Sequence, residues 1–210
     1  MIRRDALLLG LSALLATATQ SFAQGRALSA EDQQLIADIG THNTKIRTMV
    51  GRFLQVDTDG GKTEGTFFLE RPNKVRFRYN PPSREEIVSV GRGFYVLNRA
   101  EKTYYAYPQD AIPLRQFLGD TIDFTKVNLV NVRRNDTYLT LTLNDDTVAG
   151  TVEVSLIFDV ETKDLTQWSL VQPNGSELTF SLYDVEKDQK IPRSYFSIDA
   201  TYTARDPSKT

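Results

Sequence analysis

Few side chains in this 210-residue sequence are suited to hydrolytic or metal chemistry. It has one histidine, His42, and no cysteine, which excludes a zinc site built from several histidines or thiolates and also a thiol nucleophile. No serine lies in a nucleophile-elbow motif, so a serine triad would depend on His42. We therefore interpret His42 as a partly exposed helix residue rather than a catalytic base, and we predict no metal and no cofactor.

Acidic residues suggest two further kinds of site, and both patterns are weak. The segment Asp57-Thr58-Asp59-Gly60-Gly61 resembles the start of a calcium loop but lacks the third acid and the closing glutamate. A hairpin turn explains it better. Carboxylate pairs for glycoside hydrolysis stay open among 27 acidic residues, yet no spacing singles out one pair. The prediction is that the protein is not an enzyme.

The N-terminal segment has the pattern of a secretory signal peptide. Two arginines precede an apolar run over residues 6–18. Small residues then surround Phe22, which indicates a cleavage site after Ala23. This run is too short to cross a bilayer, which needs about 20 apolar residues. We expect residues 1–23 to be removed and residues 24–210 to be exported as one domain, because no linker or repeat divides them.

The net charge argues against a nucleic-acid partner. The formal charge is −2, and removal of residues 1–23 takes away one net positive charge. A chain so close to neutrality is not suited to hold nucleic acid over its whole surface. The lack of cysteine has a second consequence. Bacterial lipoproteins carry their acyl anchor on a cysteine at the cleavage site, so we do not expect this chain to be a lipoprotein itself.

One amphipathic helix is expected early in the exported chain, over residues 31–47. Ser29, with Asp32 three residues on, resembles an N-cap. Leu35 and Ile39 begin an apolar series at helical spacing. The apolar face of this helix must pack against another element.

After this helix the apolar period changes to two. The alternation is clearest in the segments 74–79, 138–143, 151–158 and 177–183. Turn residues bound them: Asp59-Gly60-Gly61, Asn144-Asp145-Asp146 and Pro173-Asn174-Gly175. We expect ten or eleven short strands, joined as antiparallel hairpins into a closed or half-closed barrel. Residues 112–118 break the rhythm and predict a short helix with Pro113 in its first turn.

Basic and apolar residues alternate along residues 74–79, so they face opposite sides of a strand. The aromatic side chains are expected to point inward, which leaves Lys74, Arg76 and Arg78 as an outer basic stripe. We interpret this stripe as a solvated sheet face rather than a docking patch or a stacking platform for nucleic acid. A barrel filled only in part by helices would leave an apolar cavity that suits a lipid.

One extended set of residues follows a recognisable pattern: Phe53-Leu54-Gln55, the run from Gly65 through Arg71-Pro72 to Val75, Phe77 and Tyr79, then Pro82 and Ile87-Val88-Ser89-Val90-Gly91. This pattern resembles that of the LolA family of periplasmic outer-membrane lipoprotein carriers. Thinner similarity follows at Ile112-Pro113, Leu118, Phe158, Trp168 and residues 195–198. Val90 departs from the pattern, in which aspartate precedes the glycine.

The resemblance implies a mainly β (α+β) fold: a curved, incomplete antiparallel barrel of about eleven strands, with helices forming a lid. In this half-barrel domain, residues 24–210, the acyl chains of lipoproteins would bind in an apolar cavity. Arg71 occupies the place of the arginine that holds the lid closed, and is the expected lid latch. The expected cavity residues are Phe67, Leu69, Val75, Phe77, Tyr79 and Ile87.

The resemblance also implies a function and partners. The expected function is a periplasmic carrier that shuttles lipoproteins from the inner to the outer membrane. Its partners would be acylated lipoproteins, an inner-membrane ABC lipoprotein-releasing complex and, where one exists, an outer-membrane lipoprotein acceptor; the carrier itself would be a monomer. The alternative is a lipid- or lipoprotein-sensing regulatory module of the same fold, although such regulators add a second domain.

Overall fold

The computed structural model describes residues 28–109, 115–147 and 150–206. The expected signal peptide and Pro113 lie outside these ranges. Within them the chain forms α1 (Ala30–Lys45), β1 (Thr48–Asp57), β2 (Lys62–Glu70), β3 (Lys74–Tyr79), β4 (Glu85–Val90), β5 (Gly93–Asn98), β6 (Thr103–Pro108), α2 (Arg115–Leu118), β7 (Leu129–Arg134), β8 (Tyr138–Thr147), β9 (Gly150–Asp159), β10 (Leu165–Val171), β11 (Glu177–Lys187), the 3-10 helix η2 (Arg193–Phe196) and β12 (Thr203–Arg205).

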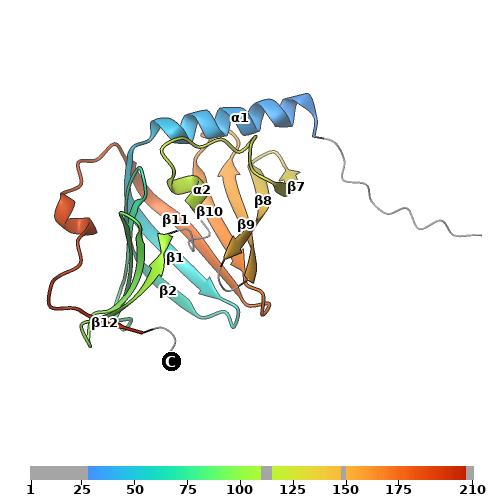
Figure 1. Cartoon of the computed structure of the whole chain (residues 1–210). Coiled ribbons are helices and arrows are strands. Elements are labelled where there is room, and N and C mark those ends of the chain that lie inside the picture. The colour runs from blue at the N-terminus through green and yellow to red at the C-terminus, as the bar shows by residue number, and fades with distance from the viewer. Residues whose placement is uncertain (1–27, 110–114, 148–149, 207–210) are drawn as a thin grey trace, which may run out of the picture.

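The twelve strands of the described ranges belong to one sheet, ordered β12-β6-β5-β4-β3-β2-β1-β11-β10-β9-β8-β7. Neighbours are antiparallel except β12 and β6, which are parallel. In the part of the chain described, no pairing joins β7 to β12, so the sheet stays open while it curves around a central space (Figure 1). The predicted incomplete barrel is confirmed, with twelve strands rather than about eleven.

Helix α1 lies across one end of the curved sheet (Figure 1). The predicted cap is present, because the Ser29 side chain accepts a hydrogen bond from the backbone N–H of Asp32 at 3.0 Å. The buried face of the helix consists of Ile36, Ile39, Gly40 and Asn43. The helix ends at Lys45, two residues before the expected end, because the next residue is already extended and leads into β1.

The concave face of the sheet holds the core. Along β8 every second residue is buried, at Leu139, Leu141 and Leu143, as period-two patterning requires. The prediction of a turn at Asn144-Asp145-Asp146 is wrong, because these residues continue β8 to Thr147. The strand tolerates Asp145 at an inward position because its carboxylate pairs with Arg115.

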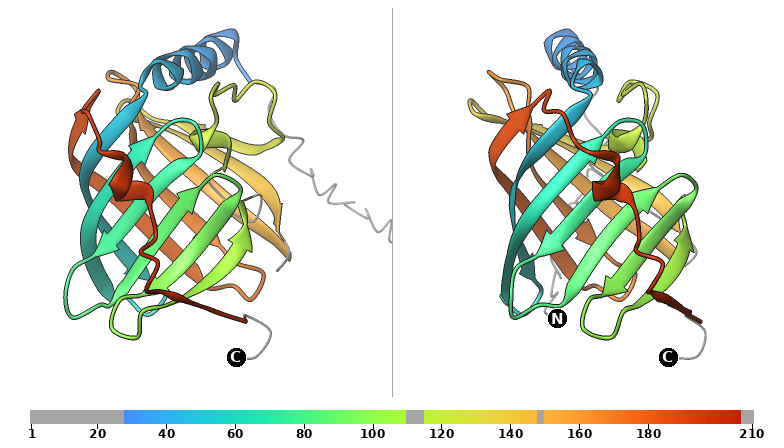
Figure 2. Two further views of the ribbon diagram at one scale, coloured as in Figure 1. Left: turned by 60° about the vertical axis from the view of Figure 1, so that its left-hand side comes forward. Right: turned by 90° about the vertical axis from the view of Figure 1, so that its left-hand side faces the viewer.

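The C-terminal segment, residues 188–206, crosses the outer face of the sheet over β3 to β6 (Figure 2). Phe196 of η2 is buried there, and the ring of Tyr195 lies 4.6 Å from the ring of Phe68, measured between centroids. We call this segment the C-terminal strap. It covers a sheet face that the residue pattern had left to solvent.

The outer basic stripe is therefore only partly solvated, which corrects the expectation for Arg76. This side chain is 16% exposed and pairs with Glu86, which is itself buried. Its Nη1 also donates to the carbonyl oxygen of Tyr195 in the strap at 2.9 Å. Arg78 and Arg99 lie around the same carboxylate. Three arginines thus surround one buried carboxylate, and Arg76 joins this charge cluster to the strap.

Candidate functional site

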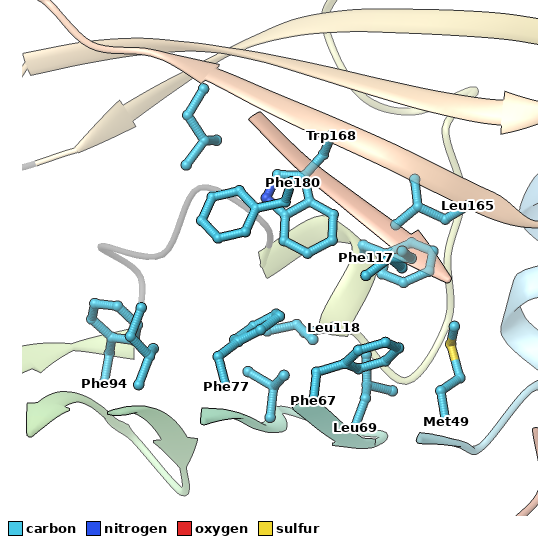
Figure 3. A pocket seen from close by; sticks show the side chains of 14 residues that line it. Met49, Phe67, Leu69, Phe77, Phe94, Phe117, Leu118, Leu165, Trp168 and Phe180 are labelled. Atoms are coloured by element: carbon cyan, nitrogen blue, oxygen red, sulfur yellow. The ribbon is translucent and has the colours of Figure 1, made fainter. Parts of the chain in front are cut away.

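An apolar cavity lies inside the curved sheet, between its two arms (Figure 3). One arm consists of the strands from β6 to β1, and the other consists of the strands from β11 to β7. The fourteen side chains that line the cavity are aliphatic or aromatic, apart from the thioether of Met49. They are Met49, Phe67, Leu69, Val75, Phe77, Ile87, Phe94, Phe117, Leu118, Leu165, Trp168, Leu170, Phe180 and Leu182. A cavity of this composition favours hydrocarbon over a polar ligand, because its lining is apolar.

Two walls and one short helix supply this lining. Strands β1 to β5 form one wall and β10 with β11 form the other, while α2 lies between them (Figure 1). Across the cavity, the ring of Phe77 lies 5.7 Å from Trp168 and 6.1 Å from Phe180. Trp168 and Phe180 stack at 4.8 Å with an interplanar angle of 10°. The cavity is therefore bounded by rigid rings whose mutual contacts stabilise both walls.

Five of the six predicted cavity residues are brought together in this lining: Phe67, Leu69, Val75, Phe77 and Ile87. Tyr79 is not among them. It packs edge-on against Phe53, and its hydroxyl donates to Gln55 Oε1 at 2.6 Å. Burial raises the pKa of the Tyr79 phenol above its usual range, so it remains a neutral donor.

Other lining residues were not singled out from the sequence as cavity residues. They are Met49, Phe94, Phe117, Leu118, Leu165, Trp168, Leu170, Phe180 and Leu182. A signal for some of them exists, because Phe180 and Leu182 occupy alternate positions of one strand. That they face β3 depends on the long-range pairing of β1 with β11, which period-two patterning does not contain.

Helix α2 fills much of the space in this closed form. Phe117 and Leu118 are each 3% exposed and belong to the lining of the cavity (Figure 3). The free volume that remains is about 100 Å³. Pockets for small molecules commonly measure about 300–1,000 Å³. A long hydrocarbon chain therefore requires this cavity to widen.

Arg71 connects three parts of the fold beside α2. It follows β2 and is 3% exposed. Its Nε donates to the carbonyl of Phe117 at 3.0 Å, and its Nη1 donates to the carbonyl of Ile46, at the end of α1, at 2.5 Å. Its guanidinium carbon lies 4.4 Å from the centroid of the Phe117 ring. One side chain thus fastens α2 and the end of α1 to the rim of the sheet.

The buried position of Arg71 disfavours its charged form. Burial, and in addition the nearby charge of Arg47, lowers the pKa of Arg71 to about 10. Its partners are neutral carbonyls, and its Nη2 has no hydrogen-bond partner among the described residues. The side chain stays charged at neutral pH, so any rearrangement that exposes it to water recovers part of the cost.

The turn between β2 and β3 provides further fastenings for α2. The backbone N–H of Asn73 donates to the carbonyl of Leu118 at 2.9 Å. Arg47 Nη2 lies 2.7 Å from Asp120 Oδ1, just beyond α2, and also donates to the carbonyl of Arg71 at 3.2 Å. These contacts hold the far end of α2 to one arm of the sheet.

Groups for other chemistry are not gathered at this cavity. Among the described residues, no cluster of three or more His, Asp and Glu side chains is placed to hold a metal. His42 lies on α1 with Nε2 2.7 Å from Asp164 Oδ1, and its side chain is 33% exposed. Within the described ranges, no helix has the length and apolarity that crossing a membrane requires.

Comparison with solved structures finds similar chains at low sequence identity. A DUF1329 family protein from Desulfovibrio piger superposes with a TM-score of 0.50 at 9% identity, covering 80% of this chain and 96% of that one. An uncharacterized conserved protein from Thermus thermophilus gives 0.48 at 8% identity, with coverages of 83% and 99%. A LolA superfamily protein from Nitrosomonas europaea gives 0.42 at 11% identity, with coverages of 76% and 96%.

Sequence comparison identifies the family. No curated protein matches the chain. The family model described as "Outer membrane lipoprotein carrier protein LolA" matches residues 44–199, a segment that includes both walls of the cavity, α2 and Arg71. Because this match spans well over half of the sequence, the chain belongs to the LolA family of outer membrane lipoprotein carrier proteins.

Proposed function

We propose that the protein is a periplasmic carrier that binds the acyl chains of lipoproteins in its apolar cavity and moves them from the inner to the outer membrane. The observation that carries this proposal is the wholly apolar cavity, enclosed by two rigid walls and stoppered by a short helix. Membership of the carrier family supports the same conclusion.

The physical chemistry of the cavity suits such cargo. Each methylene group removed from water contributes about 0.8 kcal/mol, so a dozen of them contribute on the order of 10 kcal/mol. A ligand bound this firmly leaves slowly unless the protein has a second state with lower affinity. The closed form, with little free volume, is a natural candidate for that state.

Arg71 is positioned to couple the two states. In the closed form it holds α2 through the carbonyl of Phe117 and holds α1 through the carbonyl of Ile46. An acyl chain that displaces α2 must break the first of these bonds. We therefore assign Arg71 the role of a latch whose closure favours release of the cargo.

The proposed partners follow from the family and from the N-terminal pattern. The signal-peptide pattern of residues 1–23 indicates export. An inner-membrane ABC complex would supply the acylated lipoproteins, and an outer-membrane acceptor would receive them. We propose no enzymatic activity, because the cavity holds no nucleophile, acid or base among its lining residues.

The test is native mass spectrometry of the protein isolated from the periplasm, as wild type and as Arg71→Leu. Arg133→Leu is the matched control, because Arg133 is exposed on β7, away from the cavity lining. We expect co-purified lipoprotein, at higher occupancy in Arg71→Leu than in the wild type or the control. Ligand-free protein in the wild type and both variants, with no uptake of a fluorescent fatty acid, would overturn the carrier function. The sensing module of the same fold would then be the remaining hypothesis.

A further inference from the structure

A carboxylate lies on the inner face of the curved sheet, where the residues around it are apolar. Asp145 follows Leu141 and Leu143 at the next inward position of β8, and it is 1% exposed. Its partner across the ladder is Val152 of β9, which is also buried. The other buried carboxylate of the described residues, Glu86, lies on the outer face with Arg76.

The partner of this carboxylate belongs to α2. Asp145 Oδ1 pairs with Nη2 of Arg115, the first residue of the helix. Asp145 Oδ2 has no hydrogen-bond partner among the described residues. Arg115 contacts Asp145 from the same four-residue helix that Arg71 holds through Phe117.

Helix α2 is therefore attached at both ends, and to opposite arms of the sheet. Its end at Phe117 and Leu118 is bonded to Arg71 and Asn73, beside β2 and β3. Its start at Arg115 is bonded to β8, which lies five strands beyond β2 in the sheet order. A helix of four residues has little stability of its own. Its place in the cavity thus depends on these attachments and on the burial of its apolar side chains.

We propose that the Arg115–Asp145 ion pair is a second fastening of α2, and that Arg115 and Asp145 are positioning residues that keep the cavity closed from the β8 side. The proposal deepens the carrier function and rests on it for its biological meaning. Admission of an acyl chain then requires release at both arms, so neither fastening alone decides whether the cavity is open.

Stability of the fold does not explain this ion pair. Burial raises the pKa of Asp145 above its ordinary value even though Arg115 acts in the opposite direction. The charged carboxylate is thus less stable at this site than in water, as is common for buried ion pairs. A costly charge that holds a small movable element is better explained by control of that element than by stability.

Amide hydrogen exchange in the ligand-free protein tests the proposal directly. The backbone N–H of Asn73 donates to the carbonyl of Leu118, so this amide loses its acceptor when α2 leaves the cavity. We expect Asp145→Asn and Arg115→Met each to raise its exchange rate about tenfold, which corresponds to about 1.4 kcal/mol. The double variant is expected to exchange no faster than either single variant, because both remove one interaction.

Asp146→Asn is the matched control, because Asp146 is the exposed neighbour on the same strand. Unchanged Asn73 exchange in Asp145→Asn, or additive effects in the double variant, would overturn the proposal. If Arg115→Met does not fold, Arg115→Lys replaces it, and the expected rate then lies between the wild type and Asp145→Asn. Because no lipid is present, this result is independent of whether the carrier function holds.

Discussion

His42 Nε2 lies 2.7 Å from Asp164 Oδ1, and this contact ties α1 to the turn between β9 and β10. Lys187 Nζ approaches the same carboxylate to 2.6 Å. One position further along α1, Asn43 Nδ2 donates to the carbonyl of Lys163 at 2.8 Å. These contacts place the single histidine of the chain in the attachment of α1, outside the lining of the apolar cavity.

His42→Gln should therefore leave acyl-chain uptake unchanged and lower the free energy of unfolding by about 1 kcal/mol, the usual net contribution of one hydrogen bond. Urea unfolding and uptake of a fluorescent fatty acid measure the two quantities. Loss of uptake at unchanged stability would instead point to chemistry at His42 and revive the enzyme hypothesis.

Trp168 provides an internal probe of cavity occupancy. It is the only tryptophan of the chain, it is 3% exposed, and it stacks on Phe180. A hydrocarbon chain that enters between the walls must alter this contact, so we expect Trp168 emission to change and to saturate with the ligand. Trp168→Phe removes the signal as a control. Unchanged emission at full occupancy, established by native mass spectrometry, would place the ligand elsewhere.

Gly65 of β2 is required by close packing. A Cβ there would lie 2.3 Å from the carbonyl oxygen of Arg78 and 2.5 Å from the ring of Phe53. Gly65→Ala should therefore destabilise the fold by about 3 kcal/mol, the upper range of overpacking costs. At Gly61 a Cβ meets only the Asp57 carboxylate, at 3.1 Å, so Gly61→Ala should change stability by less than about 0.5 kcal/mol. Equal urea midpoints for the two variants would contradict this account.

Asp145 should give the protein an unusual dependence on pH. Burial, the largest effect, raises the pKa of this group above 3.8, so the folded state binds more protons than the unfolded state between the two pKa values. The stability that Asp145 contributes therefore falls as pH rises through that window and is constant above it. Asp145→Asn lacks this loss.

The expected result is that the stability of Asp145→Asn, relative to the wild type, increases from pH 3 to neutrality. Urea unfolding at a series of pH values measures it, and Asp146→Asn serves as the control. A relative stability of Asp145→Asn that decreases over this range would show that Arg115 outweighs the burial cost.

The sequence pattern predicted the elements of the fold well, because local physics determines them. The cap at Ser29 and the burial of Ile39 follow from helix geometry. The inward side chains of β3 follow from the period of two, and five of the predicted cavity residues line the cavity. Their role in binding acyl chains stays a prediction.

Other features depend on contacts between distant parts of the chain, which a local pattern does not contain. The residues Asn144-Asp145-Asp146 have turn composition, and only the arrival of Arg115 from α2 makes a charged inward position acceptable within β8. The parallel pairing of β12 with β6 joins segments about 100 residues apart, and it follows from the strap rather than from any hairpin. The cavity residues of β10 and β11 required the same kind of information.

The missing pairing between β7 and β12, in the part of the chain described, also bears on the width of the cavity. In a closed barrel, the number of strands and their stagger together fix one radius. An open sheet has no such condition, so a small change of twist at each strand alters its curvature while every ladder hydrogen bond is kept. The carrier that we propose can thus adjust the width of its cavity to thicker or thinner bundles of hydrocarbon chains.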